Sequence, residues 1–233
     1  MLDEINAKLI SSRLTGNIPA KVIGEWMQIV CLDLEGVLVP EIWIAVSEKT
    51  KISSLRATTR DIPDYDVLMR QRLKILRENN LTLKDIQDVI GTLKPLDGAL
   101  DFLNWLRERF QVAILSDTFD EFALPLMRQL GYPMLLCHRL KIDNNGMVVG
   151  YCLRQKDAKR ESVKAFKNLK YKVIAAGDSY NDTTMLSEAH AGILFKPPQN
   201  VINDFPQFPV TKNYVELQDT ILETQKRLIA EEV

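Results

Sequence analysis

Residues 28–35 read Gln28-Ile-Val-Cys-Leu-Asp33-Leu-Glu35, an apolar run that ends in two closely spaced carboxylates. A run without polar alternation predicts a strand that is buried on both faces, as in a parallel sheet covered by helices. Two further runs share this character: residues 111–115 end at Ser116, and residues 172–176 end just before Gly177 and Asp178. Together the three runs predict the central strands of a doubly wound, Rossmann-like α/β sheet that is mainly parallel.

Helical patterns separate these runs. Apolar residues at helical spacing predict one helix before the second strand and another after it, which makes a βαβ repeat. The two stripes are Ala99, Leu103, Leu106 and Phe110, then Phe122, Leu126 and Leu130. Residues 134–153 instead hold two strand-like runs around Asp143-Asn-Asn-Gly146, which predicts a hairpin added antiparallel at the sheet edge.

Residues 41–95 contain helix patterns and no convincing strand, so we expect a small all-helical cap between the first and second strands. One of its helices is predicted to begin at Thr82, because Asp85 three positions later completes a capping signal. The expected division is a core, this cap, a C-terminal helix that packs on the core, and an N-terminal extension whose apolar spacing leaves a short docked helix open. The boundaries are 27–40 and 96–210 for the core, 41–95 for the cap, 211–233 for the C-terminal helix, and 1–26 for the extension.

The composition is that of an ordinary globular protein, with 46% hydrophobic and 26% charged residues and a formal net charge of −1. That charge balance favours neither nucleic acid nor an anionic membrane as a partner. No apolar run reaches the roughly 18–20 residues of a membrane span, and we expect a cytoplasmic protein. The three cysteines are isolated, so we expect reduced thiols and neither a disulfide framework nor a zinc site.

Asp33 and Glu35 lie close enough to repel each other unless a cation or a shared proton intervenes. Because side chains alternate along a strand, both can face the same way where the strand opens into a loop. One carboxylate could then attack phosphorus beside a hard divalent cation, while the other protonates the leaving oxygen. The alternative at this point is a surface turn that carries two solvated acids.

Polar residues follow the other two central strands as well. Ser116 and Asp117 offer a hydroxyl and turn amides to a phosphoryl oxygen, although the same pair is also an ordinary helix cap. Asp178 follows the third strand, with Asn181 and Asp182 one turn later. That spacing suits a magnesium ligand supported by a second carboxylate and an amide. The competing interpretation is an Asx-turn loop that caps a helix.

Lys159 falls in the first turn of a helix that is predicted to begin at Asp157. A lysine there opposes the helix dipole, at a cost of roughly a few tenths of a kcal/mol. The position is understandable if the helix terminus and Lys159 together face an anion. Lys156 is a rival nearby, and either lysine could be solvated. Because carboxyl ends of parallel strands meet at one crevice, all these signals converge where α/β sheets bind ligands.

Four motifs in this order carry a resemblance: Asp33-Leu-Glu35-Gly-Val37, Ser116, Lys159, and Gly177-Asp178-Ser-Tyr-Asn181-Asp182. They resemble the four motifs of the haloacid-dehalogenase superfamily, and the helical segment 41–95 resembles its small C1 cap. Longer runs are similar to the branch of that superfamily that combines phosphoserine phosphatase with homoserine phosphotransferase activity, namely residues 31–43, 57–68 and 173–194. The resemblance extends from about residue 27 to about residue 209.

The resemblance implies an aspartyl-phosphate mechanism. Asp33 would be the nucleophile and Glu35 the general acid/base, while Mg²⁺ would lie among Asp33, the main-chain carbonyl of Glu35, and Asp178. Residues that would bind the phosphate end of the substrate are Ser116, Asp117, Lys159 and Asn181, with Asp182 in support. Most superfamily phosphatases carry Asp where this chain has Glu35, but the branch with transferase activity shares the Glu.

Selection of phosphoserine needs a cation for its carboxylate and an anion for its ammonium group. Arg72 shares a helical face with apolar residues, which alone favours an arginine that snorkels from the edge of that stripe. By resemblance to phosphoserine phosphatases, Arg72 instead binds the substrate carboxylate as a bidentate clamp, and Glu41 meets the ammonium group. From the residues alone, Glu41 is a favourable acid at a helix N-terminus. His138 and His190 fit no triad or metal spacing and are assigned no role.

The expected function is Mg²⁺-dependent hydrolysis of O-phospho-L-serine to L-serine and phosphate, with phosphoryl transfer to homoserine left open. Such an enzyme would serve serine and threonine biosynthesis. Two alternatives remain: a phosphatase for another small phosphomonoester, such as a nucleotide or sugar phosphate, and a non-catalytic phospho-ligand binding protein. The expected partners are small-molecule substrates, and a homodimer is left open.

Overall fold

The computed structural model describes residues 27–58, 61–62 and 64–231. Its centre is a seven-stranded sheet in the order β4-β3-β2-β1-β5-β6-β7. The strands are β1 Gln28–Leu32, β2 Gln111–Phe119, β3 Met134–Ile142, β4 Val148–Cys152, β5 Lys172–Gly177, β6 Ala191–Phe195 and β7 Val210–Thr211. Neighbouring strands are parallel except β3 and β4, which are antiparallel. The predicted α/β fold with a mainly parallel sheet is confirmed.

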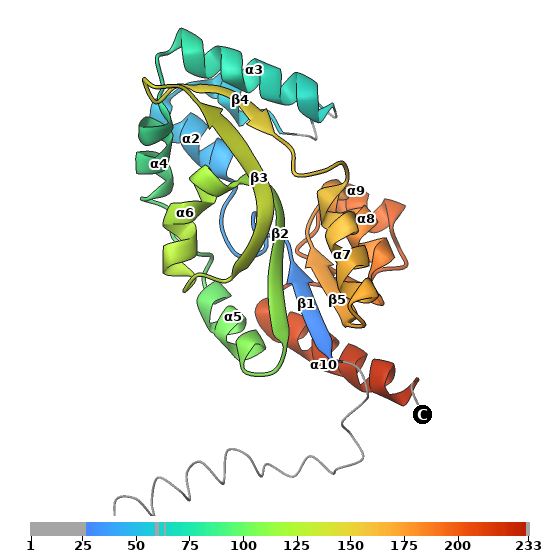
Figure 1. Ribbon diagram of the computed structural model, residues 1–233. Coiled ribbons are helices and arrows are strands. Elements are labelled where there is room, and N and C mark those ends of the chain that lie inside the picture. The colour runs from blue at the N-terminus through green and yellow to red at the C-terminus, as the bar shows by residue number, and fades with distance from the viewer. Residues whose placement is uncertain (1–26, 59–60, 63, 232–233) are drawn as a thin grey trace, which may run out of the picture.

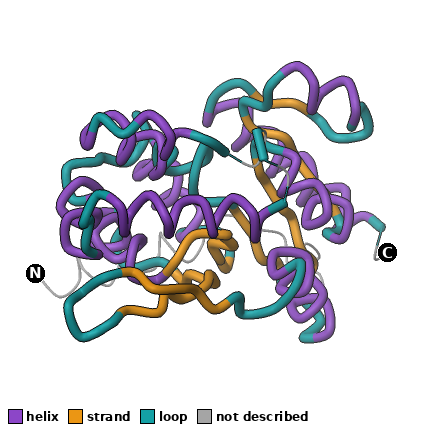
Figure 2. The backbone as a smooth tube through the Cα atoms, turned by 90° about the horizontal axis from the view of Figure 1, so that it is seen from above, coloured by secondary structure: helices purple, strands orange, loops and turns teal. Residues whose placement is uncertain are grey.

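Helices cover both faces of this sheet (Figure 1). They are α2 Ile42–Thr50, α3 Tyr65–Glu78, α4 Leu83–Ile90, α5 Ala99–Arg107, α6 Asp120–Gln129, α7 Ala158–Asn168, α8 Thr183–Glu188, α9 Gln199–Asp204 and α10 Tyr214–Ala230, with 3₁₀ turns η1 Ser53–Arg56 and η2 Tyr180–Asp182. Helices α5, α6 and α10 contribute to one hydrophobic cluster, and α7 and α8 contribute to a second. The view from above shows the strands with helices around them (Figure 2). Of the helices described, none has the length and apolar character that a membrane span requires.

Strand β1 explains why its sequence shows no polar alternation. Val30 and Leu32 lie in one hydrophobic cluster, while Ile29 and Cys31 lie in the other. Each face of the strand is therefore covered, and every residue after Gln28 is buried. Because β1 pairs with β2 on one side and β5 on the other, its carboxyl end lies at the centre of the sheet edge.

The second strand is longer than predicted. It continues through Ser116 and Asp117 to Phe119, although its pairing with β3 is irregular between Leu115 and Phe119. The prediction that Ser116 follows this strand is therefore wrong: Ser116 lies within it. Where the pairing is irregular, polar residues can belong to a strand although their side chains do not alternate regularly between its faces. The sequence beyond Leu115 has no apolar pattern that would predict this extension of β2.

The hairpin of residues 134–153 is confirmed, with a correction. Only β4 is antiparallel, whereas β3 pairs in parallel with β2 and extends the central sheet. Strands β6 and β7 and helix α9 were not predicted from the sequence. Both strands are short, and Gly192 weakens the apolar pattern of β6.

The described part of residues 41–95 forms α2, η1, α3 and α4 and contains no named strand. These helices gather beyond the carboxyl end of β1 (Figure 1). The predicted start at Thr82 is confirmed, because Thr82 and Asp85 form a reciprocal capping box. We call this segment the insert. Leu83 N–H donates to the carbonyl of Gly146 at 2.8 Å, which ties the insert to the β3–β4 hairpin.

The division into core, cap and terminal segments stays a prediction. The C-terminal helix α10 buries Leu217, Ile221 and Leu228, as expected of a helix that packs on the sheet. The helix left open within residues 1–26 lies outside the described residues.

Candidate active site

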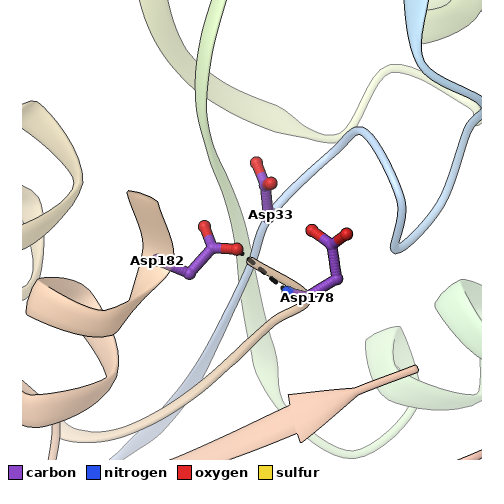
Figure 3. Close-up of side chains that lie close together, drawn as sticks. All are labelled: Asp33, Asp178 and Asp182. Atoms are coloured by element: carbon purple, nitrogen blue, oxygen red, sulfur yellow. Dashed lines mark hydrogen bonds between the residues drawn. The ribbon is translucent and has the colours of Figure 1, made fainter. Parts of the chain in front are cut away.

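Three buried carboxylates converge at the carboxyl ends of β1 and β5 (Figure 3). Asp33 follows β1, Asp178 follows the neighbouring strand β5, and Asp182 ends the short turn η2. One oxygen from each lies within 4.8 Å of the others. Parallel pairing of β1 and β5 thus brings together residues that are far apart in the sequence. Three like charges at this separation require compensation by a cation or by protonation.

Lys159 supplies one compensating charge from the first turn of α7. Its side chain is 3% exposed, and its Nζ lies 2.7 Å from Asp182 Oδ1, 2.9 Å from Asp33 Oδ1 and 3.7 Å from Asp117 Oδ2. Burial lowers the pKa of Lys159, but these carboxylates outweigh burial and hold the pKa well above its usual value. The ammonium group is therefore charged. The rival Lys156 is exposed.

The pKa of Asp33 depends on opposing effects of burial, neighbouring carboxylates and Lys159. Burial and the charge of Asp182 raise its pKa well above the usual value, and Lys159 opposes them. Its Oδ1 accepts a hydrogen bond from Leu34 N–H at 2.7 Å in addition to the ion pair with Lys159. A further positive charge beside Asp33 would favour the ionised, nucleophilic form.

Both carboxylate oxygens of Asp182 accept hydrogen bonds within the site, which leaves them little capacity to bind a metal ion. Its Oδ1 accepts from Lys159, while its Oδ2 accepts from the main-chain N–H groups of Asp178 and Ser179 at 2.9 and 3.1 Å. Among the three carboxylates, Asp33 and Asp178 are therefore the better candidates for ligands of a divalent cation.

Gly36 allows the loop after β1 to pass close to Asp178. It has a φ of +78°, which favours glycine, and a Cβ at this position would lie 2.5 Å from Asp178 Oδ2. A larger residue would both strain the backbone and displace the Asp178 carboxylate. The loop conformation and the position of Asp178 thus depend on each other.

Glu35 lies half-buried in the same loop. Its Oε2 accepts a hydrogen bond from Ile42 N–H at 2.8 Å, at the start of α2. Burial and the charge of Glu41 raise the pKa of Glu35 to about 7, against the opposing effects of Ile42 N–H and Arg72. A carboxyl group with this pKa can both donate and accept a proton near neutral pH.

Ser116, Asp117 and Asn181 line the same cavity as Lys159. Ser116 is buried, and its Oγ accepts from Thr118 N–H at 3.2 Å. Asn181 donates through Nδ2 to Asp117 Oδ2 at 3.2 Å. Burial raises the pKa of Asp117. The charge of Lys159 and the hydrogen bonds that Asp117 accepts outweigh burial and bring this pKa well below the usual value. Asp117 is thus a fixed anion that orients its neighbours.

His138 is a part of this region that the sequence did not reveal. It is buried, and its Nε2 lies 3.5 Å from Asp117 Oδ1. Its Nδ1 accepts a hydrogen bond from Arg154 N–H at 3.1 Å. This hydrogen bond places the proton of a neutral imidazole on Nε2, facing Asp117. No spacing to another motif could have indicated it, because His138 reaches the site from the separate strand β3.

A cavity of about 1110 Å³ joins these groups to the insert. Arg72 lines it from α3 and is 7% exposed, so its side chain is mostly covered by protein and does not extend into solvent as a snorkelling arginine would. Arg72 Nε is the one buried side-chain nitrogen or oxygen atom without a hydrogen-bond partner among the described residues. Burial lowers the pKa of Arg72 to about 10, against the opposing charge of Glu35, so it is still protonated at neutral pH.

Glu41 lines the same cavity from the start of α2. It occupies the N-cap position, but its side chain makes no capping hydrogen bond. The cavity therefore presents a buried cation and a half-buried carboxylate near one another, beyond the cluster around Asp33. Such a pair suits a ligand that carries both an anionic and a cationic group.

We predict that Lys159→Met lowers the free energy of unfolding by about 3–5 kcal/mol in metal-free buffer, since it leaves buried carboxylates without their cation. Urea denaturation measures this loss. Lys156→Met is the matched control, because Lys156 is exposed, and should change stability by less than about 0.5 kcal/mol. Equal effects of the two substitutions would contradict the central role of Lys159 in this cluster.

Two bacterial proteins are similar to this chain over most of its length. The phosphoserine phosphatase ThrH of Pseudomonas aeruginosa is 69% identical over 204 residues, which cover 88% of this chain and 100% of that protein. A phosphoserine phosphatase of Pseudomonas syringae pv. tomato is 68% identical over 201 residues, or 86% of this chain and 85% of that protein. The resemblance noted in the sequence is thereby confirmed.

The fold has counterparts among solved structures. A phospho-aspartyl intermediate analogue of phosphoserine phosphatase superposes with a TM-score of 0.68, over 84% of this chain and 99% of that chain, at 18% identity. This similarity concerns the fold alone. A family model described as haloacid dehalogenase-like hydrolase matches residues 27–190, which include β1, β5 and all the residues of the carboxylate cluster. The chain belongs to the haloacid dehalogenase-like hydrolase family.

Proposed function

We propose that this hydrolase removes the phosphate of O-phospho-L-serine through a phosphoryl group carried on Asp33. The observation that carries the proposal is the buried Arg72, which lines the same cavity as Asp33 and whose Nε has no hydrogen-bond partner among the described residues. A phosphatase without selection for a carboxylate has no need to bury an arginine with an unused donor. The names of the two Pseudomonas relatives support the same substrate.

The first chemical step uses Asp33 and Glu35. An oxygen of Asp33 attacks phosphorus, and the bond from phosphorus to the serine oxygen breaks. The departing oxygen takes its proton from Glu35, whose pKa of about 7 suits a general acid. In the second step Glu35, now ionised, accepts a proton from water as that water attacks the phosphoryl group on Asp33. Phosphate leaves, and Asp33 and Glu35 return to their initial states.

The residues around Asp33 stabilise the phosphoryl oxygens. Lys159 is charged and buried, so it offers a strong hydrogen-bond donor in a site of low polarity. Ser116 adds a hydroxyl. We assign Asp117 an indirect role: because its side chain stays anionic, it orients Lys159 and Asn181, and any contact with phosphate would come from its main chain.

The donor set fits Mg²⁺, which prefers oxygen ligands. Asp33 and Asp178 would provide carboxylates, and the main-chain carbonyl of Glu35 would provide a third oxygen. When bound, Mg²⁺ would neutralise charge on the phosphoryl oxygens and on Asp33. Asp182 would support the site from behind, because its oxygens already bind Lys159 and the main chain of residues 178–179.

Arg72 and Glu41 would select the amino-acid part of the substrate. Arg72 would bind the carboxylate, and Glu41 would bind the ammonium group. The helical insert, which supplies both residues, would then act as a cap that determines substrate choice. No part of this recognition involves the phosphate, so it can be tested separately from the chemistry.

Phosphoryl transfer to homoserine is a second proposed activity. Glu35 is one methylene longer than the Asp of most related phosphatases, which changes the position of its carboxyl group relative to phosphorus. We propose that this makes activation of water less favourable and leaves the phosphoryl group on Asp33 for an alcohol acceptor. The name ThrH of one relative is consistent with such a link to threonine synthesis.

Removal of divalent metal should abolish turnover of phosphoserine, and Mg²⁺ should restore it. Asp178→Asn should raise the Mg²⁺ concentration needed for half-maximal activity by roughly tenfold or more, since it removes a proposed ligand. Asp182→Asn is the comparison, and it should mainly lower the free energy of unfolding. A normal Mg²⁺ dependence in Asp178→Asn would exclude Asp178 as a ligand.

Arg72→Ala should lower the ratio of kcat/KM for phosphoserine to kcat/KM for an aryl phosphate by roughly 30-fold, the effect of losing about 2 kcal/mol of a charge-assisted contact. Steady-state assays with both substrates measure the ratio. Arg70→Ala is the matched control, because Arg70 is exposed on the same helix. An unchanged ratio in Arg72→Ala would favour a different small phosphomonoester as the substrate.

Glu35→Asp should increase the share of phosphoryl groups that reach water when phosphoserine and homoserine are present together. The shorter side chain restores the position that most related phosphatases use for water activation. Free phosphate and phosphohomoserine are measured in the same reaction. The explanation for transfer fails if their ratio is the same in Glu35→Asp and in the unmodified protein.

A further inference from the structure

We propose that Trp43 is a positioning residue that fixes the guanidinium of Arg72 for recognition of the substrate carboxylate. The inference rests on the proposed function, since it concerns the group that would select phosphoserine. Trp43 belongs to none of the four motifs and carries no ionisable group. Its role follows from what its indole ring contacts on each side.

The ring covers one face of the guanidinium. Arg72 Cζ lies 4.5 Å from the centroid of the Trp43 ring, and both side chains are 7% exposed. A cation over an indole face is attracted by the ring quadrupole, most strongly where water is excluded. Burial destabilises the charged form of Arg72, as its lowered pKa indicates. The attraction to the Trp43 ring offsets part of this cost.

Two further contacts hold the edge of the guanidinium. Arg72 Nη2 donates to the carbonyl of Ala57 at 2.9 Å, and Nη1 lies 3.8 Å from Met69 Sδ. The ring and these two neighbours engage one face and both terminal nitrogens, while Nε has no hydrogen-bond partner in the part of the chain that the structure describes. A planar group held in this way can rotate little, and a carboxylate must meet it in a defined orientation.

Trp43 is itself held in place from the core. Its ring packs edge-to-face against Phe122 of α6, with centroids 5.4 Å apart, and Phe122 packs in turn against Phe119 at the end of β2. Such aromatic pairs are directional as well as apolar. These ring contacts fix the Arg72 guanidinium, which belongs to the insert, relative to the sheet. The sheet carries the residues that would bind the phosphate.

The same turn of α2 also holds Glu35. Ile42, the residue before Trp43, donates its N–H to Glu35 Oε2 at 2.8 Å. Two adjacent residues therefore connect the proposed acid/base and the proposed carboxylate clamp. Loss of the Trp43 ring should reduce this alignment and leave the groups around Asp33 in place.

The test compares Trp43→Leu and Trp43→Phe with the unmodified protein. The readout is the ratio of kcat/KM for phosphoserine to kcat/KM for an aryl phosphate, which has no carboxylate. Trp43→Leu should lower this ratio about tenfold, mainly through KM for phosphoserine, and Trp43→Phe should recover most of the loss because it retains an aromatic face. Trp105→Leu is the matched control: Arg109 Cζ lies 4.9 Å from the Trp105 ring, outside the cavity, so its loss should leave the ratio unchanged.

The double variant Trp43→Leu/Arg72→Ala separates this inference from the proposed function. If Trp43 acts through Arg72, adding Trp43→Leu to Arg72→Ala should not lower the ratio further. An unchanged ratio in Trp43→Leu, beside a lowered ratio in Arg72→Ala, would overturn the role of Trp43 alone. An equal loss of both substrates in Trp43→Leu would also overturn it, because the ring would then be only structural. An unchanged ratio in Arg72→Ala would instead refute the carboxylate clamp itself.

Discussion

The buried ammonium group of Lys159 is the contact on which the rest of the site depends. It lies within 2.9 Å of both Asp182 and Asp33, in surroundings where an unpaired charge would be costly. Lys159 also occupies the first turn of α7, where the helix dipole disfavours a cation. Both costs are offset because the ammonium group binds two carboxylates, Asp33 just after β1 and Asp182 in the turn after β5. Asp33 can therefore remain buried beside Asp178 and Asp182 while it lines the cavity that Arg72 also lines.

The sheet and the insert supply different kinds of side chain to two ends of the cavity. Pairing of β1 with β5 assembles Asp33, Asp178 and Asp182, which suit phosphate and a divalent cation. The insert adds Arg72 and Glu41, which suit an amino acid. The two ends meet at the first turn of α2, where Ile42 binds Glu35. Chemistry shared across a large family can then be combined with selection of one substrate without change to the sheet.

The sequence was most informative where a local pattern determines the structure. The apolar run before Asp33 predicted β1 because both of its faces are buried, and the Thr82–Asp85 pair predicted a helix start because a capping box is local. Ser116 was misplaced, because an irregular pairing with β3 extends β2 beyond its apolar run. Periodicity placed Arg72 on an apolar stripe but could not show that Trp43 covers it. His138 was missed because its partner Asp117 comes from another strand.

The central claim is that Asp33 carries the phosphoryl group during turnover, and it can be measured directly. The protein is mixed with phosphoserine and Mg²⁺, quenched in acid within milliseconds, and digested for mass spectrometry. The account predicts one phosphoryl group on the peptide that contains Asp33, at Asp33 itself, and no such adduct in Asp33→Asn. Release of phosphate without any phosphorylated Asp33, or with the phosphoryl group on a different residue, would contradict the account.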